Sequence, residues 1–94
     1  MRTEDARDKI MDMCQNANKP CRVIDNFRFI CSATPFTPFS TKVTVRKINT
    51  PHLTCEYFTI KIEDMYNPEL YKIITLKEHH NQLSSTFVNI NFTP

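Results

Sequence analysis

The 94-residue chain contains no glycine. At the usual glycine frequency of about 7%, roughly one chain in a thousand of this length would lack glycine by chance. P-loops, dinucleotide-binding fingerprints, nucleophile elbows and standard EF-hand loops all need glycine, because each has a position with positive φ or without room for a Cβ atom. The sequence therefore excludes these motifs, and its turns must be built from other residues.

The chain also has no extended apolar segment. The segment from Met1 to Asp5 is polar and charged, and no apolar stretch of the signal-peptide type follows it. No other segment approaches the roughly eighteen apolar residues of a membrane-spanning helix. We therefore expect an intracellular protein, cytoplasmic or nuclear, that does not bind membranes.

Positive and negative charges are nearly balanced. Twelve Lys and Arg side chains are interleaved along the chain with ten Asp and Glu, which gives a net charge of +2. Dedicated nucleic-acid surfaces are usually more basic than this. With 40% hydrophobic and 23% charged residues the chain can bury a modest core, so we expect a single domain over residues 1–94.

Four cysteines are present, and their expected state depends on the compartment. In a reducing compartment we expect free thiols that pack as small hydrophobic side chains. In a secreted protein the even number would allow two disulfides in three connectivities. The cysteines are Cys14, Cys21, Cys31 and Cys55.

From Thr3 to about Asn18 the apolar residues repeat with helical spacing. Thr3 is the expected N-cap, and the helix should end before Pro20, because proline disfavours the helical conformation in the preceding residue. The expected apolar stripe consists of Ala6, Ile10, Met13 and Ala17, widened by Met11 and Cys14.

After Pro20 the hydrophobic period changes to two, which indicates β-strands. Asparagine and proline supply the turns in place of glycine, and the short connections favour antiparallel neighbours. We therefore predict an α+β fold in which one N-terminal helix packs on a curved antiparallel sheet of four to five strands. The expected strands cover residues 21–31, 41–48, 52–63, 70–78 and 84–92, with turns at 49–51, 64–68 and 79–81.

No residue pattern singles out a catalytic or metal site. His79 and His80 are adjacent, so in a strand their rings point to opposite faces and cannot easily reach one ion. His52 and Cys55, which could serve as base and nucleophile, also fall on opposite faces. The cysteine spacing lacks the two pairs of a zinc finger. We therefore predict no catalytic residue, no metal site and no cofactor.

A basic strand face offers an alternative. Several Lys and Arg side chains fall on the expected sheet close to Tyr57 and Phe29, where they could bind a single strand of nucleic acid. The same pattern is typical of the solvent-exposed face of a half-buried sheet. The candidate nucleic-acid contacts are Lys42, Arg46, Lys47 and Lys61.

Several alternating stretches resemble the curved sheet of the nuclear transport factor two-like superfamily, in which an N-terminal helix packs in the bend of a twisted antiparallel sheet. The shorter cystatin-like arrangement, one helix across four or five strands, is equally similar. The resemblance to the first family implies a cone-shaped fold around a cavity for a small ligand or substrate. The acid, tyrosine and histidine of that family's enzymes have no matching motif here, nor has the inhibitory loop of the cystatins. The similar stretches are residues 27–31, 42–45, 57–62, 71–76 and 82–88.

Apolar residues fall on both faces of the expected sheet, and one helix cannot cover both. Exposed apolar patches usually mark binding surfaces, and two-fold pairing of identical surfaces is a common way to cover them. We therefore predict a non-catalytic protein–protein interaction module that forms a homodimer or binds another protein. The alternatives are a single-stranded nucleic-acid-binding module and a cone-fold enzyme or small-ligand binder. The expected interface residues are Val43, Val45, Tyr57, Phe58, Ile60 and Ile62.

Overall fold

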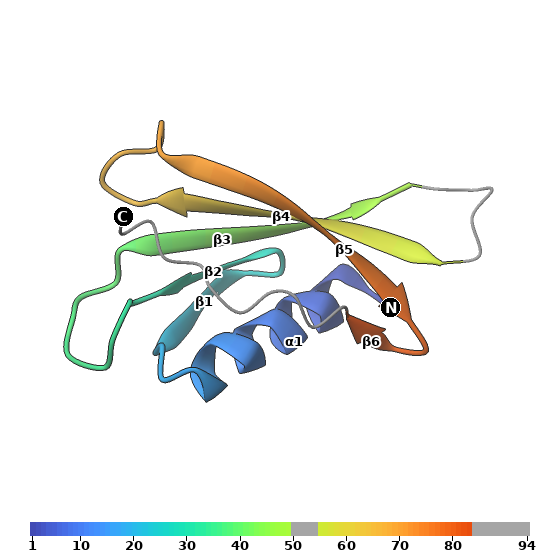
Figure 1. Cartoon of the computed structure of the whole chain (residues 1–94), viewed down its shortest axis with the longest axis horizontal. Helices are drawn as coiled ribbons and strands as arrows, with labels where there is room; N and C mark the ends of the chain where they lie inside the picture. Colours follow the sequence, from blue (N-terminus) through green and yellow to red (C-terminus); the bar gives the residue numbers. More distant parts are fainter. Residues whose placement is uncertain (50–54, 84–94) are drawn as a thin grey trace.

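The computed structural model describes residues 1–49 and 55–83. One helix lies along one side of a curled antiparallel sheet whose strands are adjacent in chain order (Figure 1). The predicted α+β class, with one N-terminal helix on a curved antiparallel sheet, is confirmed, although the described residues form six strands instead of four or five. The elements are α1 (Thr3–Asn16), β1 (Cys21–Asp25), β2 (Arg28–Cys31), β3 (Thr41–Ile48), β4 (Glu56–Asp64), β5 (Tyr71–His79) and β6 (Gln82–Leu83).

The helix α1 includes Thr3, so the prediction of Thr3 as the N-cap is wrong. Arg2 is the cap residue: its backbone is extended, and its carbonyl oxygen accepts a hydrogen bond from the Ala6 amide at 3.0 Å. No side chain caps this end of the helix, but Glu4 and Asp5 lie in the first turn, where the helix dipole favours negative charge. The acidic side chains therefore stabilise this end through the helix dipole and not by a capping hydrogen bond.

A left-handed residue ends α1. Asn18 has a φ of 62°, a conformation that asparagine adopts more readily than most residues other than glycine. The Lys19 amide donates to the Cys14 carbonyl and the Asn18 amide donates to the Gln15 carbonyl, each at 3.0 Å, which is the Schellman arrangement. The chain therefore reverses at Asn18 without the glycine that usually occupies this position.

The segment predicted as one strand over residues 21–31 is a hairpin. The Asp25 carboxylate accepts a hydrogen bond from the Phe27 amide at 2.8 Å and forms an ion pair with Arg28 at 2.9 Å. A carboxylate that accepts a bond from the amide two residues ahead stabilises a tight turn, here at Asn26 and Phe27. The predicted strand is thus divided into β1 and β2, which raises the number of strands.

A two-residue turn joins β5 to β6. His80 and Asn81 have φ values of 51° and 61°, the two positive values that a type I′ turn requires. The predicted turn at 79–81 is therefore confirmed, with histidine and asparagine where glycine is common. The predicted strand over residues 84–92 and residues 50 and 51 of another predicted turn lie outside the described residues.

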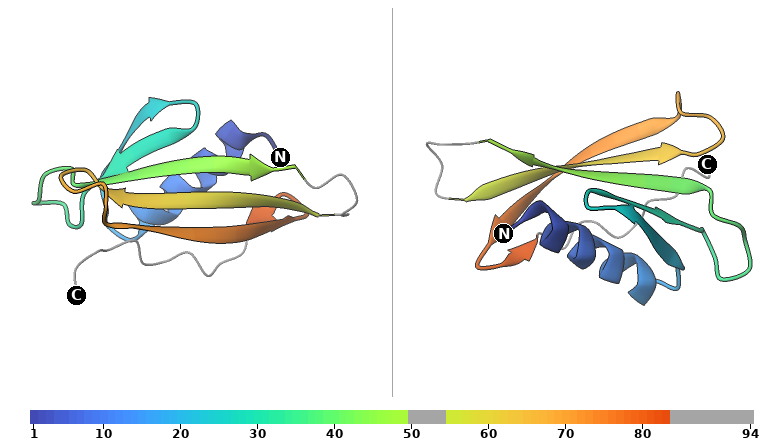
Figure 2. Two further views of the ribbon diagram at one scale, coloured as in Figure 1. Left: turned by 90° about the horizontal axis from the view of Figure 1, so that it is seen from above. Right: turned by 180° about the vertical axis from the view of Figure 1, so that it is seen from behind.

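The helix α1 packs against one face of the sheet, and no helix of the described residues covers the other face (Figure 2). We call the second the open face; across the middle of the sheet it carries Arg28, Thr44, Lys61 and Ile73. The hydrophobic core lies between α1 and the helix-side face. It consists of Ala6, Ile10 and Cys14 of the helix with Phe29, Cys31, Val43, Val45, Phe58, Ile60, Ile62, Leu76 and Leu83 of the sheet.

Candidate functional site on the open face

The residues predicted to form an interface lie mostly beneath α1. Five of the six have no exposed area, so another chain cannot contact them in this fold. Only Tyr57 lies on the open face, where it is half-buried. The predicted interface is therefore corrected: the helix covers the more apolar face, and the surface left for a partner is the open face. The five buried residues are Val43, Val45, Phe58, Ile60 and Ile62.

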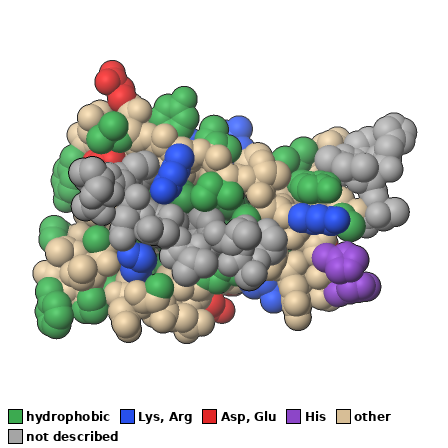
Figure 3. All heavy atoms as spheres, viewed as in Figure 1, with side chains coloured by type: hydrophobic (Ala, Val, Ile, Leu, Met, Phe, Trp, Pro, Cys, Tyr) green, Lys and Arg blue, Asp and Glu red, His purple; other side chains and the backbone are tan. Residues whose placement is uncertain are grey.

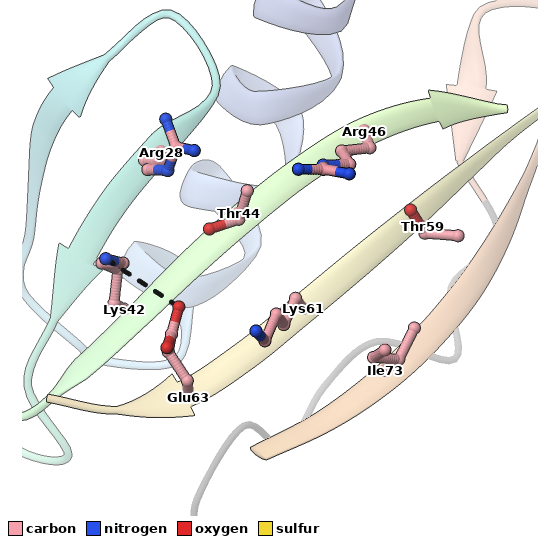
Figure 4. Close-up of a pocket in the computed structure, with 8 residues that line it drawn as sticks. All are labelled: Arg28, Lys42, Thr44, Arg46, Thr59, Lys61, Glu63 and Ile73. Carbon is pink, nitrogen blue, oxygen red and sulfur yellow. Dashed lines mark ion pairs between the residues drawn. The ribbon is translucent and has the colours of Figure 1, made fainter. Parts of the chain in front are cut away.

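The open face contains a groove of about 410 Å³ (Figure 4). Its lining comes from β2, β3, β4 and β5, so the groove crosses the sheet. Four of its eight lining residues are cationic and one is acidic. The lining residues are Arg28, Lys42, Thr44, Arg46, Thr59, Lys61, Glu63 and Ile73.

Strand register brings these side chains together. Antiparallel pairing places Thr44 of β3 opposite both Arg28 of β2 and Lys61 of β4. In a neighbouring row Lys42 lies opposite Glu63. Residues directly opposite each other in a sheet point to the same face, so each row presents its polar side chains on one side. Cations from three strands therefore converge on one groove.

Carboxylates partly neutralise two of the four cations. The Lys42 ammonium lies 3.9 Å from the Glu63 carboxylate, and the Arg28 guanidinium lies 2.9 Å from that of Asp25. The hydrogen bond from the Phe27 amide, with a smaller effect of Arg28, holds the pKa of Asp25 below its usual value. Asp25 therefore stays charged beside Arg28, although it is not part of the groove lining.

The other two cations have no carboxylate partner among residues 1–49 and 55–83. The Lys61 ammonium lies 5.1 Å from the centroid of the Tyr71 ring, a cation–π contact that leaves its charge uncompensated. Arg46 lines the groove and forms no ion pair in the described part of the chain. These two side chains supply most of the groove's net positive charge.

Three of the four predicted nucleic-acid contacts line the groove. Lys42, Arg46 and Lys61 point to the open face, as strand alternation predicts. Lys47 does not: it lies on the helix-side face, where its ammonium is 2.8 Å from the Glu56 carboxylate. Adjacent residues of a strand face opposite ways, so Lys47 does not line this groove although Arg46 does.

The aromatic side chains are distributed differently from the prediction. Phe29 has no exposed area and belongs to the core, so it cannot contact a ligand, whereas Tyr57 lies on the open face. The sequence prediction missed Arg28 and Tyr71, which also lie on the open face. Alternation with Phe29 could have placed Arg28 on this face, but Tyr71 is placed there only by its pairing with Glu63.

The two described histidines project together from one end of the molecule (Figure 3). The ring centroids of His79 and His80 are 4.1 Å apart, and the Cys55 sulfur lies 3.8 Å from Nδ1 of His79. The structure thus pairs Cys55 with His79, whereas His52 lies outside the described residues. Within the part of the chain that the structure describes, no group of three or more His, Cys, Asp or Glu side chains is placed to hold a metal ion.

Comparison of the chain with protein-family models, with curated proteins and with solved structures finds no match. The similarity to the nuclear transport factor two-like and cystatin-like folds therefore stays a prediction. No helix within residues 1–49 and 55–83 is long and apolar enough to cross a membrane. A function has to be inferred from the chemistry of the open face itself.

Proposed function

We propose that the protein binds a single strand of nucleic acid across its open face. One observation carries this function: four cationic side chains from β2, β3 and β4 line a single groove that contains one carboxylate. Clustered cations attract the phosphates of a nucleic-acid backbone. Local clustering matters more here than the net charge of +2, because only one of the ten acidic side chains of the chain lines the groove.

Two tyrosines on the same face provide surfaces on which bases can stack. Tyr71 on β5 is 55% exposed and contacts Lys61 of the groove. Tyr57 lies near the start of β4, four residues before Lys61. Proteins that bind single strands combine a basic groove with such aromatic surfaces, and stacking contributes about 1–3 kcal/mol per base. Bases are accessible for stacking in a single strand and not in a duplex, so a single strand is the favoured ligand.

Electrostatic binding of this kind has a measurable salt dependence. Each phosphate contact to a single strand contributes about 0.7 to the slope of log affinity against log salt concentration. Four contacts therefore correspond to a slope of about −3. We expect the affinity to fall about fiftyfold between about 50 and 200 mM salt.

Fluorescence anisotropy with a labelled oligothymidylate of about 16 nucleotides tests this function. Lys61→Glu should weaken binding about tenfold and reduce the magnitude of the salt slope by about 0.7 or more, because it removes a cation from the groove. Lys9→Glu is the matched control: it makes the same change in charge on the exposed side of α1, away from the groove.

The proposal requires that Lys61→Glu weakens binding more than Lys9→Glu does. Equal losses in Lys61→Glu and Lys9→Glu would mean that binding follows the net charge of the chain and not the groove. If the oligonucleotide does not bind at about 50 mM salt, the open face has no nucleic-acid function.

Self-association is the second candidate, and a different feature favours it. Apolar side chains from the β4–β5 turn and from β5 are exposed: Ile73, which lines the groove, by 59% and Leu70 by 50%. A homodimer would cover them, and Ile73→Lys should then convert the dimer to a monomer in light scattering at micromolar concentration. A wild-type monomer would contradict this candidate. The exposed large hydrophobic residues of this turn and of β5 are Met65, Tyr66, Leu70, Tyr71 and Ile73.

A further inference from the structure

Three of the four cysteines come together where α1 ends and the β1–β2 hairpin begins. The reversal at Asn18 returns the chain so that the Cys21 sulfur lies 3.9 Å from the Met11 carbonyl oxygen of α1. Cys14 faces the sheet from the last turns of α1, and Cys31 belongs to the same core. All three are free thiols. We call Cys14, Cys21 and Cys31 the thiol cluster.

Cys21 and Cys31 lie directly opposite each other in β1 and β2. The Ser32 amide donates to the Pro20 carbonyl at 3.1 Å, so Pro20 and Ser32 form a hydrogen-bonded pair. Hydrogen-bonded and non-hydrogen-bonded pairs alternate in an antiparallel ladder, which makes the two cysteines a non-hydrogen-bonded pair. Cα atoms in such pairs are about 4.5 Å apart, within the range of about 4.4–6.8 Å found in disulfides.

The three thiols differ in access and acidity. Cys21 is only partly buried, whereas Cys14 is 4% exposed and Cys31 is 1% exposed. Hydrogen bonding from Cys14, and then from Cys31, lowers the pKa of Cys21. Hydrogen bonding to the other two thiols and burial raise the pKa of Cys14. Because the thiolate is the nucleophilic form, Cys21 is the member of the cluster that a solvent-borne oxidant reaches and reacts with.

We propose that the thiol cluster is an oxidation site, in which Cys21 and Cys31 form a reversible disulfide when a peroxide is present. The Cys21 thiolate attacks one oxygen of hydrogen peroxide, the O–O bond breaks, and the departing hydroxide takes up a proton to become water. Cys21 is then a sulfenic acid. The Cys31 sulfur attacks the Cys21 sulfur, the S–O bond breaks, and the hydroxide leaves with the Cys31 proton as a second water.

The step is balanced, since two thiols and one peroxide give one disulfide and two waters. The two sulfurs lose two electrons, and the peroxide oxygens gain them. The new bond joins β1 and β2 next to Pro20, where the ladder lacks one hydrogen bond because proline has no amide proton. A thiol reductant restores the free cysteines.

Peptide mapping of the whole chain tests this oxidation site. After treatment with hydrogen peroxide and blocking of the remaining thiols with a maleimide, trypsin releases residues 10–22, with Cys14 and Cys21, and residues 29–42, with Cys31. A Cys21–Cys31 bond links the two peptides until a reductant separates them. The link should persist in Cys14→Ala and be lost in Cys31→Ala.

Cys55→Ser is the control variant and should retain the link, because Cys55 lies outside the thiol cluster. Three results would overturn the proposal: a disulfide confined to residues 10–22, sulfinic or sulfonic acid at Cys21 without a disulfide, or intact cluster thiols at peroxide concentrations that oxidise Cys55. Mapping in Cys14→Ala identifies the bonded pair even if Cys31→Ala does not fold, since only one thiol then remains in residues 10–22.

Discussion

The helix-side face and the open face are built from the same strands but have opposite chemistry. Along β4, Phe58 and Ile60 have no exposed area, while Thr59 and Lys61 line the groove on the other side. The two sets are one residue apart in the sequence, and successive side chains of a strand point to opposite faces. One strand can therefore contribute to both the core and a candidate binding site, provided that another element covers only one face of the sheet.

The packing of α1 determines which of the two sets of strand side chains forms the core. The seam of Ala6, Ile10 and Cys14 is fully or almost fully buried, and it packs on the apolar residues of β2, β3 and β4. Packing it on the open face would bury Lys61 and Arg46 without charged partners, which is costly. A slip of one residue in any strand would exchange its two sets of side chains, so the register is strongly specified.

A matched pair of isoleucines tests the difference between the two faces most directly. Ile60 has no exposed area, and Ile73 on the neighbouring strand is 59% exposed. Ile60→Ala should lower the free energy of unfolding by about 2–5 kcal/mol, because it leaves a cavity in the core. Ile73→Ala should change it by about 0.5 kcal/mol or less. Urea denaturation followed by circular dichroism measures both, and equal losses would mean that the open face is packed as well.

A substitution in the β5–β6 turn tests whether β6 contributes to the stability of the core on the helix-side face. That strand supplies Leu83, which is 8% exposed and belongs to the core. Asn81→Val should lower the free energy of unfolding by about 1–2 kcal/mol, because a β-branched residue is strained at a φ of 61°.

The control for this turn is Asn26→Val. Asn26 lies in the β1–β2 turn and has no positive φ, so valine should be tolerated better there. Thermal denaturation of both variants compares the two positions. A loss at Asn81 no larger than at Asn26 would contradict the contribution of the left-handed turn to stability.

Disrupting the ion pairs on the helix-side face should have the smallest effect on the free energy of unfolding. Glu56 lies 2.8 Å from both the Lys47 ammonium and the Met1 ammonium. Hydrogen bonds from Lys47, and then from Met1, hold the pKa of Glu56 below its usual value. This carboxylate therefore stabilises the fold above its unfolded pKa, and the contribution is lost as the pH falls through the lower folded pKa.

Glu56→Gln should reveal that contribution. At about pH 7 the variant should be less stable by less than about 1 kcal/mol, because the carboxylate is 37% exposed and screened by solvent. The difference should shrink as the pH falls below about 4, where the wild-type carboxylate also becomes neutral. Urea denaturation at several pH values measures it, and a difference independent of pH would mean that charge is not its cause.

Elements that depend on neighbours in the chain could be predicted from the sequence. The helical spacing placed α1 correctly to within two residues, and the turn at 79–81 followed from the residues that tolerate positive φ. The β1–β2 turn was missed because it depends on one bond from the Asp25 carboxylate to the Phe27 amide. The same residues are compatible with an irregular extended strand, so the pattern alone does not distinguish the two.

The candidate site was predicted less completely than the fold. Alternation placed Lys42, Arg46 and Lys61 on one face, and the structure agrees. Lys47 was grouped with them although it is adjacent to Arg46 and faces the other way. The contribution of Tyr71 depends on the pairing of β5 with β4, which no local pattern reveals.

Which side chains share a face of each strand and which residues can replace glycine at the turns depend on local backbone geometry, so both follow from the sequence alone. Three arrangements are visible only in the folded chain: α1 covers one particular face of the sheet, cations from three strands meet in one groove, and Cys21 lies opposite Cys31. These arrangements follow from strand register and helix packing, which join residues that are far apart in the chain.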